Sequence, residues 1–447
     1  MRDDKSILLV HAAGACDATG FHHADVSAVV RLSTSPNTSH VELIAIGPRA
    51  ELAAHPAAIG RDPIDLPHCI LIPGLTNAHA HLDLTHLGPR PFDADAGFVA
   101  WIGGILKARD ELATPVADAV RLGIAKSQAG GVVAIGDISG TPEAAQILRD
   151  GPLRGIGFLE VFGLGDRAAS NWARTLETLE SMHAPGDEDA PLRISVQPHA
   201  PYSASRDVYD DASSWAATHA MPIATHWSET PAEFEFVAQR TGPMCNFLKR
   251  LGIADARALE EFGHGATPIE HVEECVRGTR VIAAHVNHAT DNDIDILAQL
   301  GATVAYCPRA SAYFHHDTMF GPHRYRDMLA RGINVALGTD SIICHPAEQA
   351  DRLSTLDDAR LLHARDGLSP QEALALITIN GARALGLDES AFVFPHTGAH
   401  ATLAGLNVVD ANGVQGDPAT RVMRATTPAE PLEFRLAQRL DARAAVR

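Results

Sequence analysis

Two histidines stand one residue apart in the segment LTNAHAHLDLTH (75–86), directly after an apolar run. In an extended strand the side chains at i and i+2 point to the same face, so His79 and His81 project together. Two imidazoles on one side of a strand suit Zn²⁺ or Fe²⁺. Because the chain has 24 histidines, about one His-x-His pair is expected by chance. The pair alone is therefore weak evidence for a metal site, and other residues of the chain must support it.

Other ionisable residues end apolar, strand-like runs further along the chain. His226 follows the run PIAT, and Asp340 ends NVALGTD. Three imidazoles and one carboxylate from three strands match a catalytic zinc site that leaves one position for water. We therefore predict that His79, His81, His226 and Asp340 bind one divalent metal, with zinc favoured and iron as the alternative.

Four further residues are candidates for catalysis or substrate binding. His285, which ends RVIAAH, is either a fifth ligand or the group that holds and deprotonates the metal-bound water. Glu229, three residues after His226, suits general acid–base work if a partly dry pocket raises its pKa; the alternative is an exposed glutamate at a helix start. His199, in QPHAPYS, either contacts the substrate or supports the metal site. Arg309, in CPRASAYF, is a second substrate-binding candidate, with packing or a surface ion pair as the alternative.

The elements that must position these residues are short apolar strands separated by amphipathic stretches such as 242–252 and 291–301. Strands that alternate with helices predict a parallel sheet. Eight such units predict an α/β fold of the (β/α)8 TIM-barrel type, whose catalytic residues lie at the carboxyl ends of the strands. A doubly wound open sheet is the alternative, although no Gly-x-Gly-x-x-Gly follows the first strand. The predicted strands span 69–81, 131–137, 155–163, 193–200, 222–229, 280–285, 303–308 and 334–340.

Both ends of the chain contain short β-like pieces, at 26–33, 41–47 and 401–409. The economical interpretation is one small β-sandwich domain built from both termini. We therefore predict a β-sandwich domain of residues 1–68 plus 391–447 and a metal-dependent barrel of residues 69–390.

The lysines argue for one metal rather than two. A binuclear site would usually need a bridging carboxylate. In related barrels this bridge is often a carboxylated lysine or a glutamate on the strand that ends with His199. None of the chain's lysines ends a predicted strand; they are Lys5, Lys107, Lys126 and Lys249.

Composition excludes several classes of partner. The chain of 447 residues has a net charge of −19, which repels phosphate backbones and argues against nucleic acid. No apolar run approaches the ~20 residues of a membrane helix. The first residues, MRDDKSILLVHAAG, place acidic side chains before a short apolar run and are interpreted as strand rather than signal peptide. The six cysteines form no Cys-x-x-Cys, which is typical of reduced thiols in a cytoplasmic protein. A homodimer is one assembly that the sequence leaves open.

Six motifs occur in order over about residues 70–390, and together they resemble the amidohydrolase superfamily. The motifs are PGLTNAHAHLDL (73–84), PHAPYS (198–203), THWSETPAEFEF (225–236), AAHVNHATDNDI (283–294), YCPRASAYF (306–314) and LGTDS (337–341). Within the superfamily the chain is similar to the aminohydrolase branch of chlorohydrolases and deaminases. It most resembles aminodeoxyfutalosine deaminase-like proteins, through GFVAWIGGILKAR (97–109) and residues 233–252. It departs from that pattern at 309–311, 314–325 and 341–346, which we expect at the pocket mouth.

The resemblance implies a role for each matching residue. His79, His81, His226 and Asp340 would bind the metal. His285 and Asp340 would orient and deprotonate its water. Glu229 would carry a proton to a ring nitrogen of the substrate. A flanking β domain is also a feature of the family.

The expected reaction is hydrolysis of a non-peptide carbon–nitrogen bond in a cyclic amidine by metal-bound hydroxide. The resemblance implies that a purine-, nucleoside- or related heterocyclic amine is deaminated, with aminodeoxyfutalosine as one candidate. The partner is therefore a small heterocyclic molecule. One alternative is hydrolysis of another carbon–nitrogen or carbon–halogen bond, as in dechlorination or imidazolone ring opening. Another alternative is a non-catalytic relative that keeps the barrel as a scaffold. Such relatives tend to lose metal ligands, whereas here every expected ligand position is filled.

Overall fold

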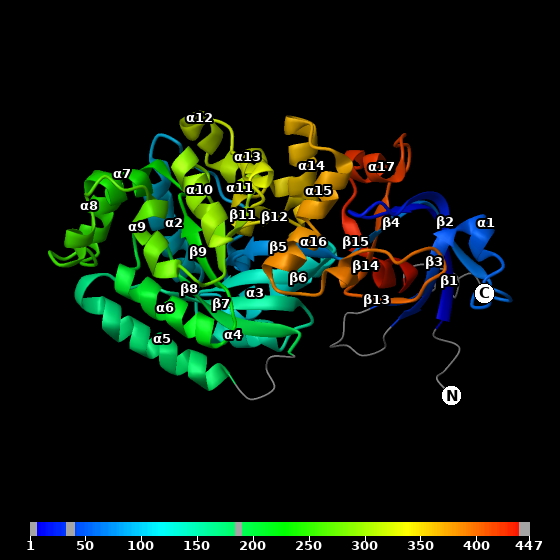
Figure 1. The fold of residues 1–447 in the computed structure, drawn as a ribbon, viewed down its shortest axis with the longest axis horizontal. Helices are drawn as coiled ribbons and strands as arrows, with labels where there is room; N and C mark the ends of the chain where they lie inside the picture. The colour runs from blue at the N-terminus through cyan, green and yellow to red at the C-terminus, as the bar shows by residue number, and fades with distance from the viewer. Residues whose placement is uncertain (1–6, 33–40, 184–189, 438–447) are drawn as a thin grey trace.

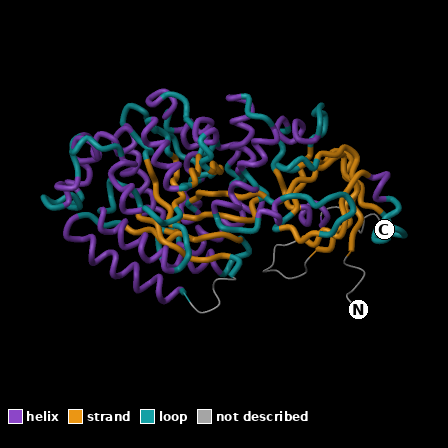
Figure 2. The backbone as a smooth tube through the Cα atoms, viewed as in Figure 1, coloured by secondary structure: helices purple, strands orange, loops and turns teal. Residues whose placement is uncertain are grey.

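The computed structural model describes residues 7–32, 41–183 and 190–437. Its strands form three sheets, one of seven strands and two of four. Figure 1 shows the two four-stranded sheets among most of the helices, and the seven-stranded sheet at the other end of the molecule. The same division is visible where the strands gather in two places in Figure 2.

The two smaller sheets are parallel and have the orders β5-β6-β7-β8 and β12-β11-β10-β9. Their edges are also in contact: the backbone N–H of His226 donates to the carbonyl of His199, and Ala80 forms a parallel bridge with Asp340. The predicted α/β fold with parallel strands is thus confirmed. The strands are β5 (Leu75–Ala80), β6 (Val132–Ser139), β7 (Arg154–Val161), β8 (Leu192–Pro198), β9 (Ile223–Trp227), β10 (Val281–His285), β11 (Thr303–Tyr306) and β12 (Asn334–Leu337).

Helices separate most of these strands, and local capping fixes where many of them begin. Thr141, Thr230 and Thr267 accept hydrogen bonds from backbone N–H groups of the first turn, and a proline opens each helix. Such caps satisfy N–H groups that lack a partner inside the helix. The helices are α2 (Gly97–Leu112), α3 (Val116–Ala129), α4 (Pro142–Arg149), α5 (Ala168–Met182), α6 (Arg206–Thr218), α7 (Pro231–Gln239), α8 (Gly242–Arg250), α9 (Pro268–Val272), α10 (Asp291–Leu300), α11 (Pro308–Tyr313), α12 (His316–Phe320), α13 (Tyr325–Ala330), α14 (Thr355–Asp366), α15 (Pro370–Leu376) and α16 (Ile379–Ala384).

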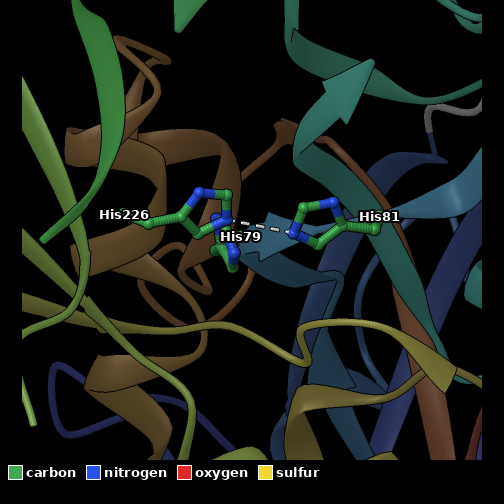
Figure 3. Close-up of side chains that lie close together, drawn as sticks. All are labelled: His79, His81 and His226. Atoms are coloured by element: carbon green, nitrogen blue, oxygen red, sulfur yellow. Dashed lines mark hydrogen bonds between the residues drawn. The ribbon is translucent and has the colours of Figure 1, made fainter. Parts of the chain in front are cut away.

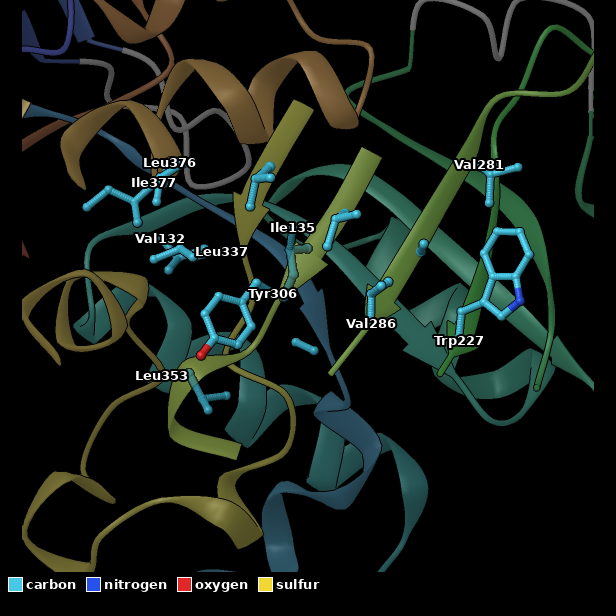
Figure 4. Close-up of a cluster of buried hydrophobic side chains, with 14 of the residues drawn as sticks. Val132, Ile135, Trp227, Val281, Val286, Tyr306, Leu337, Leu353, Leu376 and Ile377 are labelled. Carbon is cyan, nitrogen blue, oxygen red and sulfur yellow. The ribbon is translucent and has the colours of Figure 1, made fainter. Parts of the chain in front are cut away.

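The core of this part of the molecule lies between the strands and the helices around them. Ile135, Val281, Tyr306 and Leu337 come from four different strands and are buried in one apolar cluster, part of which Figure 4 shows. Strands that are buried on both faces are typical of parallel sheets covered by helices. The core therefore holds the strand ends rigidly, as a precise site requires.

The seven-stranded sheet combines strands from both ends of the chain in the order β13-β3-β2-β1-β4-β14-β15. It has its own core, which includes Val10, Leu43, Leu71 and Val408. Its arrangement as a β-sandwich stays a prediction. The elements are β1 (Ile7–Cys16), β2 (His22–Leu32), β3 (Val41–Pro48), β4 (Pro63–Pro73), β13 (Ala401–Leu403), β14 (Leu406–Asp410) and β15 (Ala429–Pro431), with helices α1 (Arg49–Leu52) and α17 (Pro418–Arg424).

The single strand predicted over 69–81 is wrong, because two strands meet there. Residues up to Pro73 belong to β4 in the seven-stranded sheet, and β5 begins at Leu75. Gly74, between them, packs so closely that an added Cβ would lie 2.5 Å from the Val133 side chain and 3.2 Å from the Cα of Gly405. Only a residue without a side chain lets the chain pass from one sheet to the other there.

Within the described ranges, every helix is too short or too polar to cross a bilayer. All six cysteines are buried.

Candidate metal centre and active site

Three histidines converge at the carboxyl ends of two strands. His79 lies in β5, His81 directly follows it, and His226 lies in β9. Figure 3 shows the three side chains pointing toward one another. One nitrogen from each falls within 4.8 Å of the others. Burial holds the pKa values of His79 and His81 well below 6.5 and that of His226 at about 4, which leaves neutral rings that can bind a metal.

The ring nitrogens of the three histidines are better placed to share a cation than to hydrogen-bond with one another. The Nε2 atom of His79 is buried without a hydrogen-bond partner, a condition that costs about 1–3 kcal/mol. The Nε2 atoms of His81 and His226 are 3.2 Å apart. Two nitrogens bound tetrahedrally to zinc at 2.0–2.1 Å would lie about 3.3 Å apart. The three rings therefore match part of a zinc-type shell.

Asp340 supplies a carboxylate to the same point. Its Oδ1 lies 3.6 Å from Nε2 of His81 and 4.0 Å from Nε2 of His79. The loop after β12 holds it there: the backbone N–H groups of Thr339 and Asp340 both donate to the carbonyl of His79. Asn77 reinforces the link, because its amide bonds the side chain and the backbone N–H of Thr339. Burial raises the pKa of Asp340 to about 7, so a neighbouring cation would stabilise its charged form.

The ring of His226 is fixed by its other nitrogen. Its Nδ1 lies 3.0 Å from the carbonyl oxygen of His199, to which it donates. This bond leaves the lone pair of Nε2 free to face His81. A backbone carbonyl that orients a histidine in this way is usual at metal sites.

Glu229 and His285 lie together beside the histidine cluster. Oε1 of Glu229 is 3.7 Å from Nε2 of His285, and both residues are buried. The backbone N–H groups of Ser228 and Glu229 donate to the carboxylate of Glu233, which fixes the turn after β9. Burial, with Asp340 and Glu233 nearby, raises the pKa of Glu229 well above 4.5. A carboxyl group that holds a proton near neutral pH is suited to general acid catalysis.

His199 also faces this region and contacts a carboxylate that the sequence analysis missed. Its Nε2 lies 3.8 Å from Oε1 of Glu160, at the end of β7, and its ring stacks on Phe162. Glu160, His199 and His226 form a second group whose ligand atoms lie within 4.8 Å of one another. The only signal for Glu160 in the sequence is one acid within the apolar strand RGIGFLEV.

Arg309 does not join the other predicted site residues. Its guanidinium donates to Oδ2 of Asp358 at 2.8 Å, to the carbonyl of Ser354 and to the side chain of Gln349. It lines a separate cavity between α11 and α14, whereas His199 lines the cavity above the histidine cluster. Its prediction as a substrate-binding residue therefore lacks geometric support, because buried ion pairing occupies the side chain.

A cavity of about 370 Å³ opens above the histidine cluster. His81, His226, Glu229, His285 and Asp340 all line it. Its size is at the lower end of the range for small-molecule sites. A buried group of neutral imidazoles and two carboxyl groups with raised pKa values at such a cavity has the chemistry needed to activate water and to protonate a bound heterocycle.

The sequence profile of the amidohydrolase family matches residues 70–391. This match covers most of the chain, and the chain belongs to the amidohydrolase family. The predicted resemblance is confirmed, and with it the prediction of a hydrolase that acts on carbon–nitrogen bonds.

Two curated relatives and one solved structure illustrate the similarity. A 5-methylthioadenosine/S-adenosylhomocysteine deaminase of Syntrophobacter fumaroxidans is 27% identical over 355 residues, 77% of this chain and 74% of the relative. An aminodeoxyfutalosine deaminase of Deinococcus radiodurans is 28% identical over 363 residues, 77% of this chain and 81% of the relative. The crystal structure of an adenosine deaminase of Xanthomonas campestris with bound zinc superposes with a TM-score of 0.65, at 20% identity, over 95% of this chain and 92% of that one.

Proposed function

We propose that this chain is a metal-dependent hydrolytic deaminase of a purine-, nucleoside- or related heterocyclic amine. The observation that carries the proposal is the buried Nε2 of His79, which has no hydrogen-bond partner although His81, His226 and Asp340 surround it. The similarity to deaminases of adenosine derivatives supports the substrate class, and aminodeoxyfutalosine is one candidate. Six cysteines without a Cys-x-x-Cys pair suit a reducing cytoplasm, which we propose as the location.

His79, His81, His226 and Asp340 would hold a single divalent cation, zinc in preference to iron, since three imidazoles and a carboxylate suit tetrahedral zinc. When bound, it would lower the pKa of water from 15.7 to about 7. One cation is favoured over two because a carboxylated lysine at a strand end, which could bridge two cations, is not found in the described part of the chain. Of the four lysines, the three in that part lie in helices α2, α3 and α8.

The remaining steps belong to side chains of this protein. Glu229 holds a proton and donates it to the ring nitrogen beside the amino-bearing carbon. Asp340 and His285 orient the attacking water and accept its proton. The water oxygen bonds to that carbon, the carbon–nitrogen bond to the amino group breaks, and ammonia leaves after a proton passes to it.

Eight parallel strands in one closed barrel would bring these residues together. The bridge from Ala80 to Asp340 and the hydrogen bond between His226 and His199 support closure at both sheet edges. We assign the barrel to residues 69–390 and a small β-sandwich domain to residues 1–68 plus 391–447, so that the boundary between them falls within β4 (Pro63–Pro73).

Metal analysis with an ammonia-release assay tests the function. The purified protein is assayed with adenosine, guanine, 5′-methylthioadenosine, S-adenosylhomocysteine and aminodeoxyfutalosine. We expect about one zinc per chain and ammonia from at least one nucleoside. Protein that holds zinc but releases no ammonia from any of them would contradict the proposal and favour hydrolysis of another carbon–nitrogen or carbon–halogen bond.

A further inference from the structure

A second cavity, of about 850 Å³, is lined by residues of α11, α14 and α17 and of the segment 344–349. Helix α14 packs against α17, as Figure 1 shows, so the cavity lies where the part with the parallel sheets meets the part with the seven-stranded sheet. It shares no described lining residue with the cavity above the histidine cluster. Its volume is in the range of small-molecule sites, and the proposed reaction does not use it.

Four arginines line this second cavity, although the chain as a whole has a net charge of −19. They are Arg309, Arg352, Arg360 and Arg424, and Asp357 is the only acidic residue among the described lining residues. Arginines gathered around a concave site attract anions and raise their local concentration. The cavity is therefore a positively charged region on an acidic protein.

Ion pairs in the cavity wall neutralise two of the four arginines. Nη2 of Arg309 donates to Oδ2 of Asp358 at 2.8 Å. Arg352 donates to both carboxylate oxygens of Asp357, at 2.8 and 3.2 Å. Because each of these aspartates already serves one arginine, any further arginine at this cavity needs an anion from elsewhere.

Arg360 and Arg424 lack a carboxylate of their own. Arg360 comes no closer than 3.6 Å to Asp357, and it donates to the carbonyls of Val422 and Thr427. Burial lowers the pKa of Arg360 to about 10, which leaves the guanidinium charged at neutral pH. Arg424, the last residue of α17, is exposed and forms no ion pair with the residues that the structure describes. Both positive charges are therefore available to a ligand.

A buried nitrogen in the cavity wall also lacks a partner. His345 is 4% exposed, and its Nε2 donates to the carbonyl of Thr339. Its Nδ1 is therefore an acceptor, and no described group donates to it. Such a buried polar atom is rare and calls for a bound molecule that satisfies it. A ligand hydroxyl would do so, while Leu361 and Met423 in the same lining offer apolar contact to a carbon skeleton.

We propose that the second cavity binds a small phosphate ester that also carries hydroxyl groups, of the class of sugar phosphates and nucleotides. Arg360 and Arg424 bind the phosphate, because guanidinium groups match phosphate oxygens in charge and geometry. His345 accepts a hydrogen bond from a hydroxyl. This site is separate from the histidine cluster and does not depend on the proposed deamination.

Isothermal titration calorimetry of the full chain tests the proposal. The probes are ribose 5-phosphate and uridine 5′-monophosphate, and ribose and uridine are their unphosphorylated counterparts. None of the four carries the amino group that the proposed reaction removes. We expect a Kd of about 1 mM or lower for at least one phosphorylated probe, and binding of its counterpart that is weaker by about tenfold or more. No binding of either phosphorylated probe, or equal binding of the counterpart, would overturn the proposal.

Three variants test where the phosphate binds. Arg424→Gln removes one charged hydrogen-bond donor and should raise the Kd about tenfold. Arg174→Gln is the matched control, because Arg174 is exposed on α5 and lies outside the cavity. His226→Ala excludes binding of phosphate to a metal at the histidine cluster. Both of these should keep the wild-type Kd, and thermal unfolding verifies that all three variants fold. An unchanged Kd in Arg424→Gln, or lost binding in Arg174→Gln or His226→Ala, would overturn the assignment.

Discussion

Two buried polar clusters in this molecule differ in how their charge is compensated. In the arginine cluster, made of Arg309, Arg352, Asp357 and Asp358, each guanidinium lies against a carboxylate: Arg309 on Asp358 at 2.8 Å and Arg352 on Asp357 at 2.8 Å. In the histidine cluster, Asp340 faces rings that burial keeps neutral.

The difference teaches how to tell a structural cluster from a functional one. Both clusters are largely buried. A buried charge must be paired or must bind an ion. The arginine cluster satisfies this condition with its own side chains, whereas Asp340 in the histidine cluster faces only neutral rings. Charge compensation, rather than burial or residue type, separates the two.

The largest expected effect is the loss of metal from the histidine cluster. His226→Ala removes one of the three nitrogens, so bound zinc should fall from about one per chain to nearly none and deamination should fall to background. Elemental analysis and the ammonia assay measure both. His264→Ala, at an exposed histidine on the surface, should leave both unchanged. Full zinc occupancy in His226→Ala would mean that the histidine cluster does not hold the zinc, and it would contradict the distinction drawn between the two clusters.

The next effect separates proton transfer from metal binding within the histidine cluster. Glu229→Gln keeps the size of the side chain but cannot exchange the proton. We expect kcat to fall by about 10²–10⁴-fold, with zinc content unchanged. Steady-state kinetics and metal analysis of the same preparation measure the two quantities. Wild-type kcat would end the role of Glu229 as the acid.

A substitution in the arginine cluster should act on stability instead. Arg309→Met leaves Asp358 buried without its cation, and we expect the free energy of unfolding to fall by about 3–5 kcal/mol. Zinc content and KM of the folded protein should not change. The matched control is Arg383→Met, which breaks an exposed pair with Glu389 and should cost less than about 1 kcal/mol. Denaturant unfolding measures both, and a raised KM in Arg309→Met would restore substrate binding to Arg309.

The smallest effect concerns the orientation of His199. The hydroxyl of Ser203 donates to the carbonyl of Ala200 and so accepts from Nδ1 of His199, which turns Nε2 toward the cavity as an acceptor. Ser203→Ala loses this bond, worth about 0.5–1.5 kcal/mol, so KM should rise about 2–10-fold while kcat and zinc content stay. A lower zinc content would instead place His199 among the metal-supporting residues.

The histidine cluster could be predicted from sequence because its signals are local. His79 and His81 share a face through the two-residue period of a strand, and His226, His285 and Asp340 each follow a buried run. Parallel strands bring their carboxyl ends together, so local patterns are enough to gather distant residues. Seven of the eight predicted barrel strands, from 131–137 to 334–340, correspond to β6 to β12 for the same reason, whereas the one over 69–81 covers parts of two strands.

Features that depend on distant partners could not be predicted. Arg309 pairs with an aspartate 49 residues away, and no pattern near Arg309 reveals that contact. The division between β4 and β5 depends on Gly405 and Val133 approaching Gly74. Glu160 is a single acid in an apolar strand, and only its position opposite His199 marks it.

The bridge between Ala80 and Asp340 has a consequence for biosynthesis. His79 leaves the ribosome early. Asp340 and Thr339, whose backbone N–H groups bond to His79 in β5, are made much later. A nascent chain therefore exposes an incomplete chelate until synthesis has nearly finished. We expect the metal ion to bind only after β12 has paired with β5. The ion would then stabilise a fold that is already formed rather than nucleate it.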